Sequence, residues 1–286
     1  MYVSLSNPHF IHSMQPLPLG VTRVDGKQPG PTSVIMAGVH GNEQSGLLAF
    51  KQYTPLRIQR GTVFMVLGNP KAVERGIRYI EENLNRCFLV GKAGASYEAR
   101  RAAELAPILD QASALLDLHA SNSRHTTPFI IAEGAGITLA QFLPFTIIST
   151  GWAELEPGST DSYMHSQGKI GLCAECGSIF DPGTATALAH QAIQGFLLIR
   201  KHVDGVQPKM TAKRYIPVTT IGMKQSADFR FAKDFSDFEV LPANQPFAWD
   251  GEMTYRAKPN QRIIFPRPDT PIGGEVFILG EEHSSP

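Results

Sequence analysis

Cysteine is scarce in this chain, and charge of neither sign predominates. Three cysteines occur in 286 residues, and 26 lysines and arginines balance 26 aspartates and glutamates. A small, odd number of cysteines argues against a disulfide framework and favours a reducing, cytoplasmic setting. Without a basic excess, the chain has no bulk charge for binding nucleic acid or an anionic membrane surface.

Long apolar runs are also absent. No segment approaches the roughly 18 apolar residues that a membrane-spanning helix needs. The N-terminal stretch has neither the basic segment nor the apolar segment of a targeting signal. Apolar residues nevertheless make up 42% of the chain and charged residues 18%, which is typical of a globular protein with a substantial core.

Short apolar runs alternate with longer helical patterns up to residue 204, which predicts an α/β fold with a mostly parallel sheet. The runs are continuous, as in strands that helices cover on both faces. They lie at 33–39, 62–67, 114–119, 128–132, 145–149 and 170–175. Helical patterns lie at 42–53, 96–113 and 184–202. We expect Ser96 to cap the second helix, Pro107 to kink or divide it, and Thr184 to open the third, which would end near Gly205.

The character of the sequence changes from residue 205. Prolines recur there, and short β-prone pieces are separated by turn residues. We therefore predict two domains, an α/β domain at 1–204 and a small all-β domain at 205–286.

Polar residues stand where several of the expected strands end, and in an open parallel sheet functional sites form at those carboxyl ends. His40 and Glu43 follow the first apolar run. His119 ends the third run and Glu175 ends the last. Two histidines and one carboxylate form a typical catalytic zinc set that leaves a coordination position open. The three-residue spacing of His40 and Glu43 lets both face one point, so we expect a zinc site where the strand ends meet.

Each of these features also has an ordinary interpretation. A lone histidine at a strand end is commonly a hydrogen-bonded loop residue, and Glu43 alone would suit the first turn of a helix. These interpretations would have to hold independently at three strand ends. Asp117 shares a strand face with His119 and could orient a histidine ligand. Cys173 and Cys176 form a C-x-x-C, but they face opposite ways on a strand, so we interpret them as packing residues.

Several motifs together resemble those of the succinylglutamate desuccinylase/aspartoacylase family. Residues 38–43 (GVHGNE) resemble its G-x-H-G-N-E motif. Residues 69–72 (NPKA), 78–79 (RY) and 83–88 (NLNRCF) resemble its N-P-x-A…R-Y…D-L-N-R-x-F block, and 116–119 (LDLH) and 175–177 (ECG) resemble its D-L-H and E-x-G motifs. The order and spacing match over about 35–180, and the phrase FPRPDTPIGGEVFIL resembles the family's ending. The resemblance implies a zinc carboxypeptidase-like α/β fold whose small C-terminal β domain caps the active site.

The resemblance also implies a role for individual residues. Three would bind one zinc ion per chain: His40, Glu43 and His119. Glu175 would be the general base that takes a proton from the attacking water, and Arg78 would polarise the amide carbonyl and stabilise the oxyanion. Asn85 and Arg86 would hold the α-carboxylate of the substrate. Amide hydrolysis needs such a base and such a positive charge, although each arginine alone would also suit the surface of this charge-rich segment.

Two departures from the family pattern bear on the site. Asn83 stands where the family usually has Asp in D-L-N-R. Aspartoacylases carry an arginine about ten residues before the catalytic glutamate, which binds the side-chain carboxylate of N-acetylaspartate. Here the stretch 161–168 contains no arginine, and His165 is the nearest candidate for substrate binding. This absence weakens the expectation of an acidic substrate.

The sequence thus predicts a cytoplasmic zinc-dependent amidohydrolase that cleaves an N-acyl amino acid into a carboxylate and a free amino acid. Its partner would be this small-molecule substrate, without nucleic acid or membrane, and a homo-oligomer stays open. One alternative is a zinc carboxypeptidase acting on short peptides, although a capping β domain would restrict long ones. Another is a non-catalytic zinc- or ligand-binding scaffold, against which the presence of Glu175 and Arg78 argues.

Overall fold

The computed structural model of the protein describes residues 16–89 and 94–285. The strands are β1 Val21–Asp25, β2 Gln28–Ala37, β3 Arg60–Leu67, β4 Ala114–Ser121, β5 Phe129–Ala132, β6 Ile147–Thr150, β7 Ile170–Ser178, β8 Arg214–Met223, β9 Arg230–Phe231, β10 Glu239–Val240, β11 Pro246–Asp250, β12 Met253–Arg256, β13 Gln261–Ile264 and β14 Glu275–Glu281. The helices are α1 Ser45–Gln52, α2 Pro70–Arg75, the 3₁₀ helix η1 Leu84–Arg86, α3 Tyr97–Gln111, α4 Ala135–Ala140, α5 Trp152–Leu155, α6 Thr160–Ser166 and α7 Pro182–Ile199. None of these helices is both long and apolar enough to cross a membrane.

An 11-stranded sheet in the order β1-β3-β2-β4-β7-β5-β6-β8-β14-β13-β10 forms the centre of the molecule, and β12-β11-β9 form a smaller sheet. Strands β3, β2, β4 and β7 run parallel, as do β5, β6 and β8. Two strands of this part run the other way: β1 at the edge is antiparallel to β3, and β5 is antiparallel to β7. This confirms the predicted α/β fold, and every predicted strand is present.

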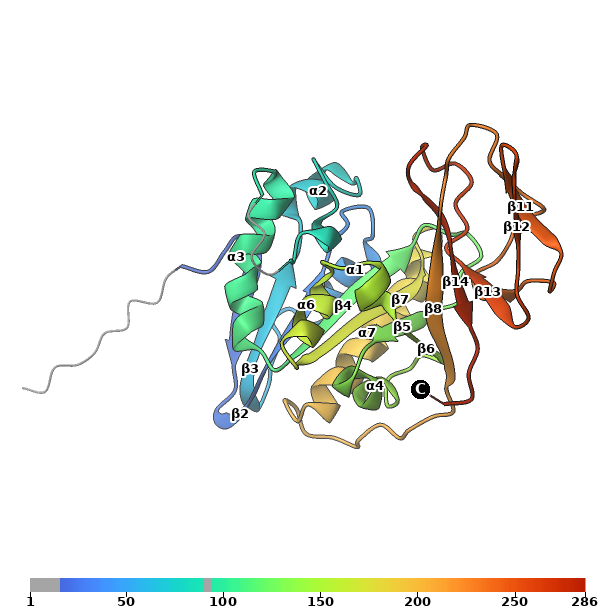
Figure 1. The fold of residues 1–286 in the computed structure, drawn as a ribbon. Coiled ribbons are helices and arrows are strands. Elements are labelled where there is room, and N and C mark those ends of the chain that lie inside the picture. Colours follow the sequence, from blue (N-terminus) through green and yellow to red (C-terminus); the bar gives the residue numbers. More distant parts are fainter. Residues whose placement is uncertain (1–15, 90–93, 286) are drawn as a thin grey trace, which may run out of the picture.

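Helices cover both faces of the parallel part of the sheet, which explains why its strands are apolar without alternation (Figure 1). In β2, Ile35 and Ala37 join the core cluster that contains residues of α1, α4 and α7. Val34 and Met36, one position out of phase, join the cluster that contains residues of α3 and of α6. Each of the larger of these side chains, Val34, Ile35 and Met36, stabilises the fold by about 1.5–3 kcal/mol when it is fully buried.

Helix α3 begins as predicted but is not divided at its proline. The Ser96 side chain accepts a hydrogen bond from the backbone N–H of Ala99, which confirms it as the N-cap. The expected division at Pro107 is wrong, because α3 continues without interruption to Gln111. Proline removes one backbone hydrogen bond, and the burial of Leu105 and Leu109 on either side of it offsets that loss.

Helix α7 begins two residues before the predicted Thr184. Asp181 is the N-cap, since its side chain accepts from the backbone N–H of Thr184, and Pro182 occupies the first turn. The helix ends at Ile199 rather than near Gly205. Lys201, with a φ of 59°, leaves the helical conformation before that glycine is reached.

The C-terminal residues extend the central sheet. Between residues 205 and 285 the described structure contains strands and no helix. Strand β8 pairs parallel with β6 and antiparallel with β14, so one sheet passes from the α/β part into the C-terminal strands. The division at 204/205 stays a prediction. Figure 1 shows that these strands lie beside the ends of β4 and β7.

Candidate active site

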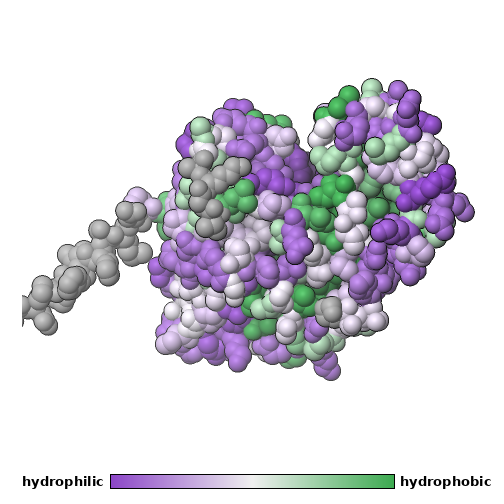
Figure 2. Space-filling view, viewed as in Figure 1, coloured by the Kyte–Doolittle hydropathy of each residue, from purple (hydrophilic) through white to green (hydrophobic). Residues whose placement is uncertain are grey.

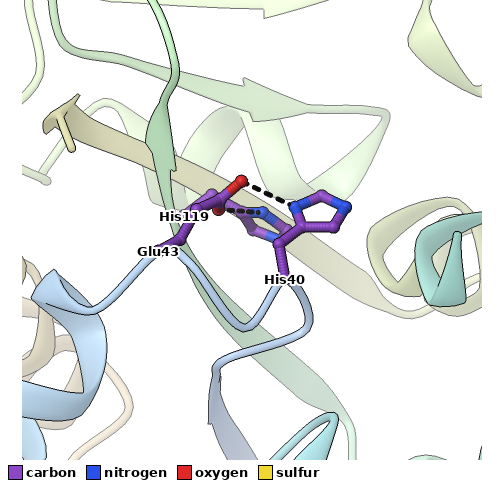
Figure 3. Close-up of side chains that lie close together, drawn as sticks. All are labelled: His40, Glu43 and His119. Atoms are coloured by element: carbon purple, nitrogen blue, oxygen red, sulfur yellow. Dashed lines mark hydrogen bonds and ion pairs between the residues drawn. The ribbon is translucent and has the colours of Figure 1, made fainter. Parts of the chain in front are cut away.

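The two histidines and the glutamate of the predicted metal site lie together (Figure 3). His40 and Glu43 belong to the turn between β2 and α1, and His119 lies in β4. Glu43 Oε1 is 2.7 Å from His40 Nδ1, and Glu43 Oε2 is 3.0 Å from His119 Nδ1. All three side chains are buried, and their candidate ligand atoms lie within 4.8 Å of one another. This cluster could hold a metal ion.

Glycine is required in the turn that carries His40 and Glu43. A Cβ atom on Gly41 would lie 2.0 Å from the backbone carbonyl carbon of Ala72. The turn therefore packs directly on the backbone of α2, at the segment that contains the N-P-K-A motif. This close approach also lets Gly41 donate a backbone hydrogen bond to the carbonyl of Arg78.

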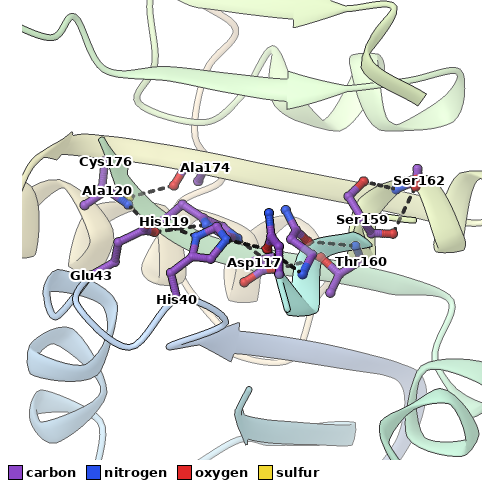
Figure 4. A network of polar contacts seen from close by, with 12 residues as sticks. His40, Glu43, Asp117, His119, Ala120, Ser159, Thr160, Ser162, Ala174 and Cys176 are labelled. Carbon is purple, nitrogen blue, oxygen red and sulfur yellow. Dashed lines mark hydrogen bonds and ion pairs between the residues drawn. The ribbon is translucent and has the colours of Figure 1, made fainter. Parts of the chain in front are cut away.

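The outward nitrogen of each imidazole faces an oxygen. Asn83 Oδ1 accepts the backbone N–H of Asn85 at 3.0 Å, which fixes its oxygen toward His40, 2.9 Å from Nε2. Because Nε2 must then donate, Nδ1 of a neutral His40 presents a lone pair to Glu43. His119 Nε2 lies 3.2 Å from Asp117 Oδ2 (Figure 4).

The arrangement fits a divalent metal ion. Two acceptor atoms that face each other at 2.7 Å in a buried site, as in His40 and Glu43, repel unless a cation or a proton lies between them. Metal-ligating histidines typically donate their other ring N–H to a fixed oxygen, which here is offered by Asn83 and Asp117. The departure at Asn83 therefore keeps the hydrogen bond while replacing a carboxylate by a neutral amide.

The electrostatics of the cluster are strongly coupled. Burial lowers the pKa of His40 to about 4, so this imidazole is neutral at pH 7. Burial opposes ionisation of Glu43, but the two histidines hold its pKa well below the ordinary range. Burial would also lower the pKa of His119, yet Asp117 and Glu43 raise it well above the usual value. The site therefore concentrates negative charge around the two imidazoles.

One cleft collects the remaining predicted residues. It is lined by all seven of the predicted metal, catalytic and carboxylate-binding residues: His40, Glu43, Arg78, Asn85, Arg86, His119 and Glu175. Glu175 in β7 stands directly opposite His119 of β4 in the sheet register. Arg78 donates from Nη1 to Glu43 Oε1 at 3.0 Å. Figure 2 shows a hollow between the two upper parts of the molecule.

Glu175 has the environment of a reactive carboxyl group. Burial, and then the charge of Glu43, raise its pKa to about 8. Its Oε2 atom is buried and has no hydrogen-bond partner among the described residues. A buried carboxylate oxygen without a partner is costly, so this oxygen is available to a water or a substrate group in the cleft.

His165 is not brought to the cleft. It lies near the end of α6, exposed, and does not line the cavity. The capped helix α6 instead points Thr160 inward, where its hydroxyl donates to Asp117 Oδ2 at 2.5 Å. The structure thus gives no support to His165 as a substrate-binding residue.

Arg267 occupies the cleft without having been predicted. It follows β13, lines the cavity and acts electrostatically on Glu175. Arg267 belongs to the phrase FPRPDTPIGGEVFIL, which resembles the ending of the family's sequences. That resemblance did not assign a role to this arginine. Glu156 and Glu275 also line the cleft, and no sequence pattern singled them out.

The C-x-x-C cysteines are buried in different core clusters, as their opposite orientations on a strand predicted. Burial raises the pKa of both thiols well above its usual value. Cys173 forms a second close group with His119 and Glu175, within 4.8 Å. A thiol that resists ionisation is a poor metal ligand, so the histidine–glutamate cluster is the better candidate.

A buried carboxylate fixes the segment that follows Arg78. Glu98, at the start of α3, accepts hydrogen bonds on both oxygens. Oε1 accepts from the Asn69 side chain and from the Ile80 backbone, and Oε2 accepts from the backbone N–H groups of Glu81 and Glu82. The loop that carries Arg78, Asn83, Asn85 and Arg86 is thereby tied to α3.

We expect Glu98→Gln to lower the free energy of unfolding by about 1–3 kcal/mol, because an amide presents only one acceptor oxygen and leaves part of these backbone N–H groups without their partner. Urea unfolding measures this change. Glu74→Gln makes the same chemical change at an exposed position of α2 and is the matched control, which should change stability by less than about 0.5 kcal/mol. Equal, small effects of both substitutions would show that the Glu98 contacts do not hold the loop.

Comparison with known proteins identifies similar sequences. The model of the succinylglutamate desuccinylase/aspartoacylase catalytic domain matches residues 29–198. An N-acyl-aromatic-L-amino acid amidohydrolase (carboxylate-forming) of Xenopus tropicalis is 37% identical over 120 residues, which cover 37% of this chain and 39% of that protein. A probable aspartoacylase of a Nostoc species is 31% identical over 166 residues, covering 51% of this chain and 54% of that protein. The matched regions thus span about two fifths to one half of these curated relatives.

The fold is shared with solved structures. The crystal structure of succinylglutamate desuccinylase from Vibrio cholerae superposes with a TM-score of 0.74 and 21% sequence identity, covering 91% of this chain and 85% of that chain. At this level of identity the likeness shows a common fold, including the C-terminal strands beyond the region of the family model.

Proposed function

Because this chain belongs to the succinylglutamate desuccinylase/aspartoacylase family, we propose that it is a cytoplasmic zinc-dependent amidohydrolase. It cleaves the amide bond of an N-acyl amino acid and releases a carboxylate and a free amino acid. The observation that carries this proposal is the convergence of the His40, Glu43 and His119 cluster with Glu175 and Arg78 in one cleft. The names of the similar proteins, an amidohydrolase, an aspartoacylase and a succinylglutamate desuccinylase, support this class of substrate.

The proposed cofactor is one zinc ion per chain, held by His40, Glu43 and His119. Two imidazoles and one carboxylate match the ligand set of catalytic zinc sites. When bound, zinc acts as a Lewis acid that activates water near neutral pH. Asn83 keeps the His40 imidazole oriented by accepting from its outer nitrogen, and the Asp117 carboxylate lies 3.2 Å from the outer nitrogen of His119.

Two side chains perform the proton and charge chemistry in this proposal. Glu175 must be ionised to act as a base, and a cation held beside it would offset the burial that raises its pKa. In that form it takes a proton from the attacking water through its unpaired Oε2 and passes it to the leaving amine nitrogen. Arg78 lies beside Glu43 and offers its guanidinium to the carbonyl oxygen, where negative charge develops. Both groups lie beside the candidate metal ligands, so proton transfer and oxyanion stabilisation act on the same bond.

Arg86 anchors the α-carboxylate of the substrate in this proposal. Its Nη1 donates to the carbonyl of Asn85 at 2.7 Å, and its Nη2 contacts Glu156. The guanidinium is therefore oriented before substrate binds, with one carboxylate already beside it.

We expect Arg86→Lys to raise KM about tenfold, since a lysine keeps the charge but cannot form the two parallel hydrogen bonds of a guanidinium. Steady-state kinetics on the best N-acyl amino acid measure the effect, and metal content should stay unchanged because Arg86 is not a ligand. An unchanged KM would move the carboxylate site elsewhere in the cleft.

Two other functions use the same scaffold. A zinc carboxypeptidase also cuts amides beside a carboxylate, but here Phe265, Arg267 and Glu275 of the C-terminal region line the cleft and restrict long peptides. A non-catalytic zinc-binding scaffold would not need Glu175 or Arg78. A panel of N-acyl amino acids and short peptides distinguishes these functions: selective release of free amino acids from the former supports the proposal.

A further inference from the structure

Four charged side chains form a continuous row along the cleft. Arg86 contacts Glu156, Glu156 and Glu275 line the same cleft and influence each other's pKa, and Glu275 lies 3.6 Å from Arg267. The first two come from the α/β part and the last two from the C-terminal strands. This charged row, defined as Arg86, Glu156, Glu275 and Arg267, joins both sides of the cleft.

The net charge of the charged row suits the binding of one additional anion. Burial favours a neutral Glu156, but Arg86 holds its pKa below the ordinary range, so it offsets one of the two arginine charges. Burial and the charge of Glu156 raise the pKa of Glu275 to about 7. Near neutral pH the row thus carries a net charge between zero and +1. When Glu275 is protonated the row carries one positive charge, which one substrate carboxylate neutralises. A substrate with two carboxylates would leave the row and substrate together with a net negative charge.

Apolar side chains form another part of the cleft lining. Trp152, Phe265, Ile131 and Cys173 all line the cavity, and none is more than about a tenth exposed. The polar atom of the tryptophan is already satisfied, because Nε1 donates to Ser149 Oγ at 2.7 Å. Figure 2 shows hydrophobic side chains gathered in the hollow on the side of the C-terminal strands.

Phe265 is held in this lining by unusual backbone geometry. Its φ of 51° is rare for a bulky residue, and its N–H donates to the buried Asp237 Oδ1 at 2.7 Å. The centroid of its ring lies 6.0 Å from that of the Trp152 ring. The Arg267 guanidinium lies over the Phe265 ring, 4.8 Å from its centroid. Such strained residues persist where neighbours fix them, commonly at functional sites. Phe265 thus connects the apolar lining to the charged row.

We infer that the cleft selects N-acyl amino acids that carry a single carboxylate and an uncharged, apolar group, which packs against Trp152 and Phe265. The inference rests on the proposed function and deepens it. Arg86 and Arg267 provide for one carboxylate, and the acyl group or the amino-acid side chain occupies the apolar lining. The missing arginine at 161–168 agrees with this selection, since no further cation awaits a second carboxylate there.

The test compares kcat/KM across two matched substrate series with the zinc-loaded protein. The first varies the side chain in N-acetyl-L-phenylalanine, N-acetyl-L-leucine, N-acetyl-L-aspartate and N-acetyl-L-lysine. The second varies the acyl group in N-benzoylglycine and N-succinylglycine. We expect the apolar member of at least one series to exceed the charged members roughly tenfold or more, which also tells which group occupies the apolar lining.

Other outcomes separate the inference from the proposed function. Preference for the aspartate or succinyl compounds would overturn the inference and leave the amidohydrolase intact. Preference for the lysine compound would overturn it by showing that Glu156 and Glu275 bind a cation. Failure to hydrolyse any of these compounds would contradict the proposed function itself.

Variants then locate the selection. Phe265→Leu should lower the ratio of apolar to charged substrates about tenfold, and Trp152→Phe provides a second change if the first fails to fold. Phe231→Leu is the matched control, because this phenylalanine belongs to β9 and does not line the cleft. If neither cleft variant alters the ratio relative to the control, the apolar lining does not select the substrate.

Discussion

Replacing Glu175 by glutamine is expected to lower turnover on an N-acyl amino acid by about 10²–10⁴-fold while the metal stays bound. Glutamine keeps the shape of the side chain but cannot accept a proton from the attacking water. The unpaired, buried Oε2 atom is the one that would do so. The change should appear in kcat, since Glu175 lies outside the cluster of His40, Glu43 and His119 and is not part of the proposed carboxylate anchor.

The measurement pairs kcat with metal content and a folding control. Glu252→Gln makes the same chemical change at an exposed position of the C-terminal region and should leave kcat unaltered. A folded, metal-loaded Glu175→Gln protein with near wild-type turnover would rule out the mechanism. A wild-type protein that is inactive on every N-acyl amino acid and peptide would instead favour the binding scaffold.

The candidate site was largely predictable because the order of neighbouring parallel strands brings its residues together. His119 and Glu175 end neighbouring parallel strands, and parallel strands present their carboxyl ends at one edge. The turn that holds His40 and Glu43 follows a third strand of the same sheet. Strand continuity and local spacing therefore sufficed to predict that these residues meet.

Residues on the C-terminal strands could not be placed in this way. Arg267 and Glu275 reach the cleft only because β8 pairs with β6 and carries β14 with it. Strand pairing between segments so far apart depends on the packing of the whole sheet. No local pattern in the short apolar stretch of β6 specifies its partner, so the sequence predicted the strands without their positions.

His165 shows the limit of placing a residue by its position in a motif. The segment from Thr160 to Ser166 is polar and resembles a loop, yet it forms α6, capped by Ser159, whose side chain accepts from the Ser162 N–H. The first turn of this helix is buried, including Asp161, whereas His165 lies in its last turn and is exposed. Pro107 shows the same limit, since burial of its neighbours outweighs one lost hydrogen bond.

Removing one histidine of the metal cluster should have the largest effect on metal content. We expect His119→Ala to lose the metal and all measurable turnover, because a site with two remaining ligands binds weakly and the loss of outer partners alone costs roughly 10–100-fold in affinity. Metal analysis of protein purified without chelator should give near-stoichiometric zinc for the wild type. The alanine variant also leaves the buried Glu43 and Asp117 carboxylates without the imidazole, so it should be less stable.

Chelation of the wild-type protein provides the same test without a substitution. A ligand that binds only the folded state stabilises it by mass action, so a strong chelator should lower Tm and abolish activity, and added zinc should restore both. His190→Ala is the control histidine substitution, since this side chain stacks on Tyr53, outside the cleft, and it should retain the metal. Full zinc in a folded His119→Ala protein, or a wild-type Tm that is indifferent to chelator, would show that this cluster does not hold the ion.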